Sequence, residues 1–145
     1  HYLMALCHDG KAKEADTMIQ AVGEDMVPGI EGAVYEALGA PLCRAIKAYA
    51  VGDFGVAVDL LYPVRRELYR IGGSHAQRDL FARLLISAGL KAGRFRLVRA
   101  LLAERLGHNP SSAWNWRRMR DAFVGLEDRA GAERAEDEYR KLNAN

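Results

Sequence analysis

The residue types that support nucleophilic or acid–base chemistry lie closest together between Ser74 and Asp79, in the order Ser-His-Ala-Gln-Arg-Asp. A serine nucleophile needs a histidine base within hydrogen-bond reach, and the histidine needs a third group that orients it. One helix turn does not bring a serine, its base and that third group into converging geometry. We therefore predict that the chain is not an enzyme, and an enzyme with a site near Ser74–Asp79 is kept as an alternative.

Metal-binding residue types are present, but their spacing is not that of a metal site. Cys7 and His8 are adjacent, so they face different directions on a helix. The other histidines have no ligand spacing: His1, His75 and His108. We predict no metal and no other cofactor.

Cysteine usage and hydropathy bear on the compartment. Cys7 and Cys43 have no paired spacing and lie in apolar surroundings, which suits a reducing compartment. No apolar run approaches the roughly 18 residues that a membrane span needs. We expect a cytoplasmic location and no membrane partner.

The stretch around Ser74 also has a structural interpretation. Ser74 and Gln77 match the S-x-x-Q capping box, in which two side chains bond amide groups at the start of a helix. Gly72 and Gly73 supply the chain reversal before that helix. A glycine pair can also bind phosphate through its amides, but the Ser74 side chain would occupy one of them. We interpret these four residues as a structural cap and turn.

The elements that carry these residues are predicted to be helices throughout. Every well-patterned window repeats its apolar residues at three or four positions, and no stretch alternates like a strand. With 145 residues, half of them apolar, the chain is long enough to fold as one domain, 1–145, of about seven helices. The last helix is expected over about Asp128–Leu142. Because the first residue is His1, we expect a fragment of a longer chain.

Glycines recur at nearly regular intervals along the chain: Gly10, Gly52, Gly93 and Gly131. Behind each of the first three, a small or β-branched residue stands five positions on, at the start of a predicted helix. Glycine permits a tight turn, and the small residue lets the second helix approach the first. This pattern predicts stacked antiparallel helical hairpins, with a shortened copy at Gly131.

The middle of the chain is basic. Residues 71–120 hold ten basic and two acidic residues, whereas residues 1–40 hold two basic and seven acidic ones. Such a segment can steer an anionic partner, or it can help the acidic ends to pack. Binding of nucleic acid or another polyanion through 71–120 is kept as an alternative function.

The run Trp114-Asn-Trp-Arg-Arg-Met-Arg120 has the composition of a surface that stacks bases and contacts phosphates. Helical spacing divides it, because Trp116 lies in register with Met119 and Phe123 and is therefore predicted to be core. Only Trp114 is left to face elsewhere, so the run does not favour nucleic-acid binding.

The spacing after Gly93 resembles the tetratricopeptide repeat, a helical hairpin of about 34 residues. Phe95, Leu102 and Pro110 fall in the register of that motif. The resemblance implies a tetratricopeptide-like α-α superhelix.

A narrower resemblance covers roughly Leu42–Pro110. It rests on Gly52-Asp-Phe, on Leu-Leu-Tyr-Pro-Val-Arg65 and on Ile71-Gly-Gly-Ser-His-Ala-Gln-Arg-Asp-Leu-Phe81. These sequences resemble the carboxy-terminal part of the tetratricopeptide repeat protein 38 family. That resemblance brings with it no enzymatic activity and no partner.

The repeat resemblance implies where a partner binds. In tetratricopeptide arrays the first helix of each hairpin lines a concave groove, so we expect a non-catalytic scaffold for a protein or peptide. An acidic partner, or another part of the parent chain, fits the basic middle segment. Arg83 and Arg117 are then expected on one side of the groove. The groove residues carried over by register are Leu42, Ile46, Tyr49, Arg83, Ser87, Trp114, Arg117 and Asp121.

The same register argues against one known mode of binding. Grooves that clamp a free peptide carboxylate use asparagines, and this chain has Ile46, Ser87 and Asp121 at those positions. We do not expect recognition of a free carboxylate terminus.

The capping interpretation makes a first prediction. Ser74→Ala removes the oxygen that accepts from an amide at the helix start, so it should lower the free energy of unfolding by about 1 kcal/mol. Urea denaturation measures the change. An unaltered free energy of unfolding would exclude a capping role for the Ser74 side chain.

Overall fold

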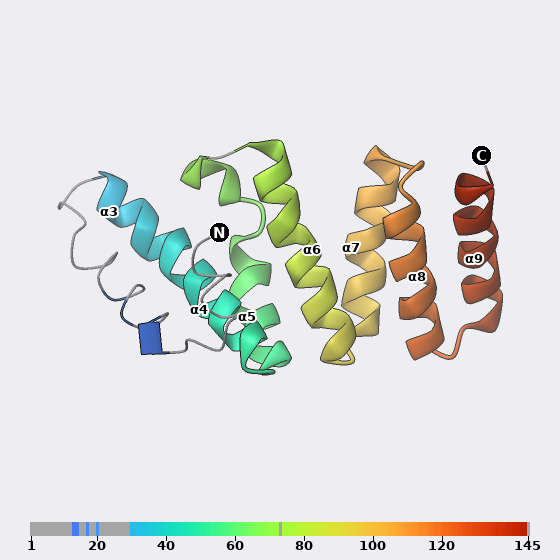
Figure 1. The fold of residues 1–145 in the computed structure, drawn as a ribbon, viewed down its shortest axis with the longest axis horizontal. Coiled ribbons are helices and arrows are strands. Elements are labelled where there is room, and N and C mark those ends of the chain that lie inside the picture. Colours follow the sequence, from blue (N-terminus) through green and yellow to red (C-terminus); the bar gives the residue numbers. More distant parts are fainter. Residues whose placement is uncertain (1–12, 15–16, 18–19, 21–29, 73, 145) are drawn as a thin grey trace. The chain divides into compact units, whose positions relative to one another are not determined.

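The computed structural model describes residues 13, 14, 17, 20, 30–72 and 74–144, and every regular element in those ranges is helical (Figure 1). The predicted all-α class is confirmed over this part of the chain. The predicted turn at Gly10, Cys7 and Gly73 lie outside the described residues.

The chain divides into two compact units, 1–88 and 89–145. Helix α6, His75–Lys91, runs across the boundary between the two units. The expectation of one domain over 1–145 stays a prediction.

In the first unit, a continuous helical stretch is followed by a hairpin partner. It consists of α3 (Ile30–Val34), the π-helical turn η1 (Tyr35–Gly39) and α4 (Ala40–Ala50). Helix α5 (Phe54–Val64) packs along α4 (Figure 1). The 3₁₀ turn η2 (Leu68–Ile71) contacts η1 and leads into α6. The most deeply buried large side chains of this unit are Leu38, Leu61, Ile86 and Val58.

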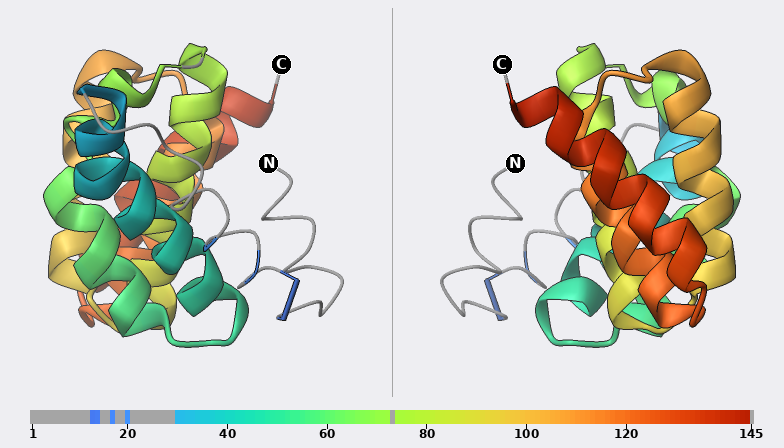
Figure 2. Two further views of the ribbon diagram at one scale, coloured as in Figure 1. Left: turned by 90° about the vertical axis from the view of Figure 1, so that its left-hand side faces the viewer. Right: turned by 90° about the vertical axis from the view of Figure 1, so that its right-hand side faces the viewer.

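The second unit continues from the end of α6 with α7 (Phe95–His108), α8 (Ala113–Gly125) and α9 (Arg129–Asn143). Helix α8 contacts both α7 and α9, and Figure 2 shows α9 lying against α8. The last helix therefore falls within one residue of its predicted bounds. The buried side chains on these helices are Val98, Leu102, Leu106, Asn115, Met119, Ala122 and Ala135.

Three helix ends share one kind of corner. At Gly52, Gly93 and Glu127 the backbone takes a positive φ of 91°, 71° and 59°. The amide of each corner residue donates to the carbonyl three residues earlier, at 3.2, 3.2 and 3.0 Å. The following amide donates to the carbonyl five residues earlier, at 2.8, 2.8 and 3.0 Å. This pair of bonds is the Schellman motif, which satisfies the last carbonyls of a helix.

Each corner also starts the next helix, because the residue after it is the N-cap of α5, α7 or α9. The connection between the two helices is therefore three residues long at all three places. The small residue five positions after each glycine is fully buried, as Ala57 and Val98 expose 0% of their surface. Gly52 and Gly93 are confirmed as turn residues between successive helices.

The shortened copy of the glycine pattern at Gly131 does not mark a turn, and Gly131 instead falls within the last helix, as the predicted bounds of that helix placed it. Gly131 lies buried inside α9, where its amide donates to the N-cap Asp128 Oδ1 at 2.9 Å. Its lack of a side chain serves packing, because a Cβ there would come within 2.5 Å of the Phe123 ring. The chain reverses at Glu127, four residues before the glycine of the shortened copy.

Trp116 was also predicted wrongly as a core residue. The buried face of α8 is formed by Asn115, Met119 and Ala122, while Trp116 and Phe123 are half-buried. The indole Nε1 of Trp116 donates to the Pro110 carbonyl at 2.8 Å, which turns the ring toward the α7–α8 connection. Asn115 can be buried because its Oδ1 accepts from Arg105 Nε at 3.1 Å.

The start of α6 agrees with part of the capping interpretation. Ser74 directly precedes the helix, and its carbonyl accepts the first helical hydrogen bond from the Arg78 amide at 3.1 Å. Gly72 takes a positive φ of 81° and reverses the chain before it. Ser74 thus occupies the N-cap position, whereas the Gln77 side chain lies outside the described residues.

The third corner makes the second prediction. A non-glycine residue at positive φ destabilises the folded state by roughly 1–2 kcal/mol. Glycine removes that strain, but it loses more conformational entropy on folding, which offsets part of the gain. Glu127→Gly should therefore raise the free energy of unfolding by up to about 1 kcal/mol. Glu133→Gly, at an exposed position inside α9, is the matched control and should lower it by about 1 kcal/mol. Equal destabilisation by both changes would contradict the corner assignment.

Candidate functional site

One of the residues considered for catalysis, Asp79, is held in another contact. Asp79 Oδ2 accepts from Arg83 Nε at 2.7 Å, one turn along α6. Ser74 and His75 are exposed at the start of the helix. The carboxylate that a Ser–His pair would need is thus engaged by an arginine.

Other features of the described residues bear on metal and membrane binding. Within residues 30–72 and 74–144 and the few described positions before them, no three His, Cys, Asp or Glu side chains are grouped so as to hold a metal ion. No helix in the described part of the chain is both long and apolar enough to cross a bilayer.

The predicted groove residues of the first unit differ in how much surface they offer. Leu42 and Ile46 each expose only 7% and belong to the core, so they present little surface to a ligand. The Tyr49 hydroxyl and Ser87 Oγ are 2.8 Å apart and link α4 to α6. Arg83 is exposed and pairs with the Asp79 carboxylate, as described above.

The predicted groove residues of the second unit lie on one helix face. Trp114, Arg117 and Asp121 are spaced by three and four positions along α8, away from its buried face. Arg117 is exposed, and the other two are half-buried. We call these three residues, together with Arg118, the α8 face.

The Trp114 ring has the guanidinium groups of two arginines nearby. The guanidinium carbons of Arg105 and Arg118 lie 5.9 and 5.7 Å from the ring centroid. Arg105 is held in this place by its bond to the buried Asn115. Cation–π contacts of this length contribute roughly 0.5–1 kcal/mol at exposed sites. They fix the indole beside positive charge.

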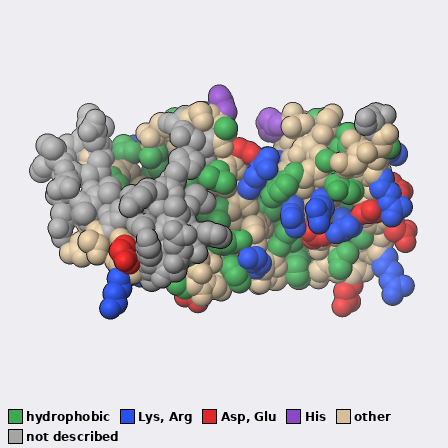
Figure 3. Space-filling view, in the orientation of Figure 1, with side chains coloured by type: hydrophobic (Ala, Val, Ile, Leu, Met, Phe, Trp, Pro, Cys, Tyr) green, Lys and Arg blue, Asp and Glu red, His purple; other side chains and the backbone are tan. Residues whose placement is uncertain are grey.

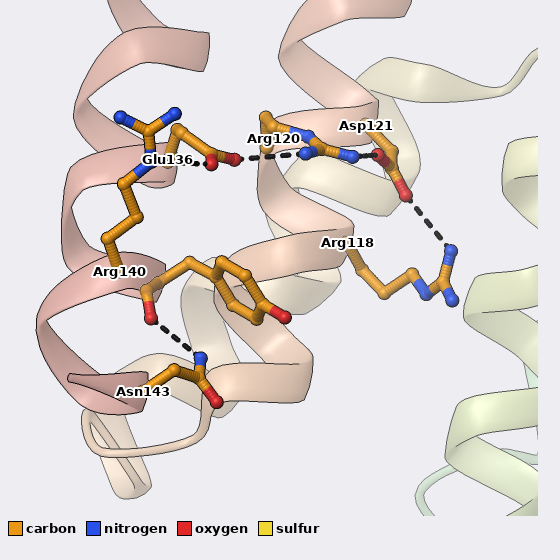
Figure 4. Close-up of polar contacts among 7 residues, drawn as sticks. Arg118, Arg120, Asp121, Glu136, Arg140 and Asn143 are labelled. Carbon is orange, nitrogen blue, oxygen red and sulfur yellow. Dashed lines mark hydrogen bonds and ion pairs between the residues drawn. The ribbon is translucent and has the colours of Figure 1, made fainter. Parts of the chain in front are cut away.

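A chain of ion pairs runs from the α8 face to α9 (Figure 4). Asp121 accepts from Arg118 at 3.0 Å and from Arg120 at 2.9 Å. Arg120 also donates to Glu136 at 2.9 Å, and Glu136 accepts from Arg140 at 2.9 Å. We call these five residues the α8–α9 ion-pair chain. Figure 3 shows basic and acidic side chains side by side over the second unit.

These pairs shift the acid–base properties of two members. The hydrogen bond from Arg120, followed by that from Arg140, holds the pKa of the Glu136 carboxyl below its usual range. The bonds to Asp121 and then to Glu136 raise the pKa of Arg120. Glu136 and Arg120 are therefore both charged near neutral pH.

Sequence reasoning found only part of this arrangement. It placed Trp114, Arg117 and Asp121 on one face of a helix, which the structure confirms for α8. It missed the bond between Arg105 and Asn115 and the link from α8 to α9. The spacing of Glu136 and Arg140 by four residues could have indicated an ion pair within one helix, but not the link to α8.

Comparison of the chain with protein-family models finds no match, and comparison with solved structures finds no significant match.

The ion-pair chain makes the third prediction. Because the folded-state pKa of Glu136 is depressed, the stabilisation is present above the usual carboxyl pKa of about 4.3 and is lost as pH falls through the folded value. Glu136→Gln should therefore destabilise the protein most near pH 7, and the effect should fade in strongly acidic solution, as measured by urea denaturation across pH.

The control for this change is Glu133→Gln, in the same helix and exposed. It should alter stability less at neutral pH. High salt should reduce the effect of Glu136→Gln, since the pairs are near the surface. A pH-independent effect would mean that Glu136 acts through packing instead of charge.

Proposed function

We propose that the chain is a non-catalytic helical-repeat scaffold, similar to tetratricopeptide arrays, that binds an acidic segment of a protein. The observation that carries this proposal is the corner that recurs at Gly52, Gly93 and Glu127. The resemblance to the carboxy-terminal part of the tetratricopeptide repeat protein 38 family stays part of the proposal.

The corners support a repeat because they recur with the same hydrogen bonds and the same short connection. The interval from Gly93 to Glu127 matches the length of a tetratricopeptide repeat, which is about 34 residues. Each hairpin of such a repeat buries its apolar face against its neighbours, and so builds a long surface suited to binding. The interval from Gly52 to Gly93 is longer because it accommodates η2 between α5 and α6.

The α8 face supports an acidic protein segment as the partner. Tryptophan, tyrosine and arginine are the residue types that contribute most to binding at protein interfaces. Here Trp114 provides apolar surface beside two guanidinium groups, and Arg117 is exposed one turn away. A carboxylate of the partner would pair with Arg117, and would compete with Asp121 for Arg118.

The alternatives are less well supported by the contacts. Nucleic-acid binding through 71–120 relies on net positive charge, but Arg83, Arg118 and Arg120 are each paired with a carboxylate. An enzyme near Ser74 would need Asp79, which Arg83 engages. A cytoplasmic location, and binding to another part of the parent chain, are further parts of the proposal that experiments with the parent chain address.

The fourth prediction concerns Arg117. Reversing its charge should weaken binding of an acidic partner by about 10- to 100-fold, in keeping with about 1–3 kcal/mol for an important interface residue. The partner is first identified by pull-down with the parent chain, and its affinity for the Arg117→Glu variant is then measured by calorimetry. Stability should change by less than about 0.5 kcal/mol, since Arg117 is exposed.

Arg134→Glu on α9 is the matched control, as it reverses an exposed arginine outside the α8 face. It should leave the affinity almost unchanged. An equal loss of affinity in both variants would show general electrostatic attraction, and an unchanged affinity for Arg117→Glu would exclude the α8 face. Whether Arg83 and Arg117 share one side of a groove stays a prediction.

A further inference from the structure

The connection between α5 and α6 exposes aromatic and basic side chains together. Within the described residues, three of the six exposed large apolar side chains belong to it or to the last turn of α5: Tyr62, Tyr69 and Ile71, exposed by 37%, 65% and 42%. Three arginines alternate with them, and the only acidic residue over 62–72 is Glu67. We call the following six residues the Tyr–Arg surface: Tyr62, Arg65, Arg66, Tyr69, Arg70 and Ile71.

The backbone holds this surface in a defined turn. Helix α5 ends at Val64, directly after Pro63, and η2 follows at Leu68 (Figure 1). The amides of Glu67 and Arg70 donate to the carbonyls three residues earlier, both at 2.9 Å. The side chain of Leu68 is 6% exposed and anchors the turn to the core. With Leu68 turned inward, its neighbour Tyr69 projects into solvent.

Arg65 and Arg70 keep hydrogen-bonding capacity for a ligand. The Arg65 guanidinium lies 3.7 Å from the centroid of the Tyr62 ring, and its Nη1 donates to the Tyr62 carbonyl at 2.6 Å. Arg70 pairs with Glu67 through Nη1 at 2.8 Å. Each of the two hydrogen bonds uses a single guanidinium nitrogen, whereas an arginine has five N–H donors.

We propose that the Tyr–Arg surface binds an extended acidic segment of a partner protein that carries apolar side chains between its carboxylates. Three arginines against one glutamate favour a partner with negative charge, because charges across an interface are complementary. The exposed side chains of Tyr69 and Ile71 favour apolar side chains in the partner. Burial of Tyr69 and Ile71 against them is the main favourable contribution that this surface can make to binding.

The size of the surface fits a short segment. The ten residues 62–71 comprise the end of α5, a turn and the 3₁₀ helix η2, and they span at most about 20 Å, which is the length of about six residues of extended chain. A single-stranded nucleic acid fits less well, because Arg65 already covers one face of the Tyr62 ring. The surface belongs to the first unit and shares no residue with the α8 face, so it goes beyond the function proposed above and can fail independently of it.

The test uses the whole chain and a fluorescein-labelled peptide of ten amino acids in which glutamate and leucine alternate. Fluorescence anisotropy should show binding that the double change Tyr69→Ser and Ile71→Ser weakens by at least about tenfold. A glutamate–serine peptide of the same length should bind at least about tenfold more weakly than the glutamate–leucine peptide. The matched control is Val51→Ser with Val56→Ser, which changes two other apolar side chains that are exposed by 58% and 52%. This variant should bind the glutamate–leucine peptide with unchanged affinity.

A second variant keeps the test decisive if the first one does not fold. Arg65→Glu with Arg66→Glu changes one half-buried and one exposed charge, and it should also weaken binding by at least about tenfold. Unchanged binding in the folded variants, or loss of binding in Arg117→Glu alone, would overturn the proposal. Tighter binding of an oligouridylate, or of vesicles that contain phosphatidylserine, than of the peptide would also overturn it.

Discussion

A helix that ends leaves carbonyl groups without partners, and a chain of short helices must satisfy them at every reversal. In this protein the same solution recurs at Gly52, Gly93 and Glu127, where one residue at positive φ allows two backbone hydrogen bonds to close the helix. The residue after it already occupies the N-cap position of the next helix. Because the connection is so short, α4 packs against α5 and α8 against α9, and the small or apolar residues on their facing sides become core.

The consequences of this constraint are visible in the second unit. Helices α8 and α9 approach closely enough for Phe123 to cover Gly131, which has no room for a side chain. At the same closeness, Arg120 on α8 reaches Glu136 on α9. The ion-pair chain that results continues through Asp121 to Arg118, which lies beside the Trp114 ring. The arrangement of the α8 face therefore depends on the corner at Glu127 as well as on the residues of the face itself.

The two surfaces proposed for binding combine the same residue types in different ways. On the α8 face, Trp114 is half-buried and the arginines beside it are drawn into contacts with Asn115 and Asp121. On the Tyr–Arg surface, Tyr69 and Ile71 project from a turn that is anchored to the core. The α8 face presents charged groups on a regular helix, whereas the Tyr–Arg surface presents apolar side chains on an irregular connection. The partner proposed for both is an acidic protein segment.

The sequence by itself determined the helical class, the corners at Gly52 and Gly93 and the position of the last helix. These features depend on local rules: apolar spacing, the freedom of glycine and the capping residues. Only the tertiary structure decided that Glu127, and not Gly131, forms the third corner, because packing against Phe123 requires glycine at 131.

The tertiary structure also decided that Asn115 is buried in place of Trp116. The amide of Asn115 is satisfied by Arg105 on the preceding helix, a partner that the apolar spacing of α8 does not reveal. The link between Arg120 and Glu136 likewise depends on how two helices are placed, and no local spacing encodes that placement.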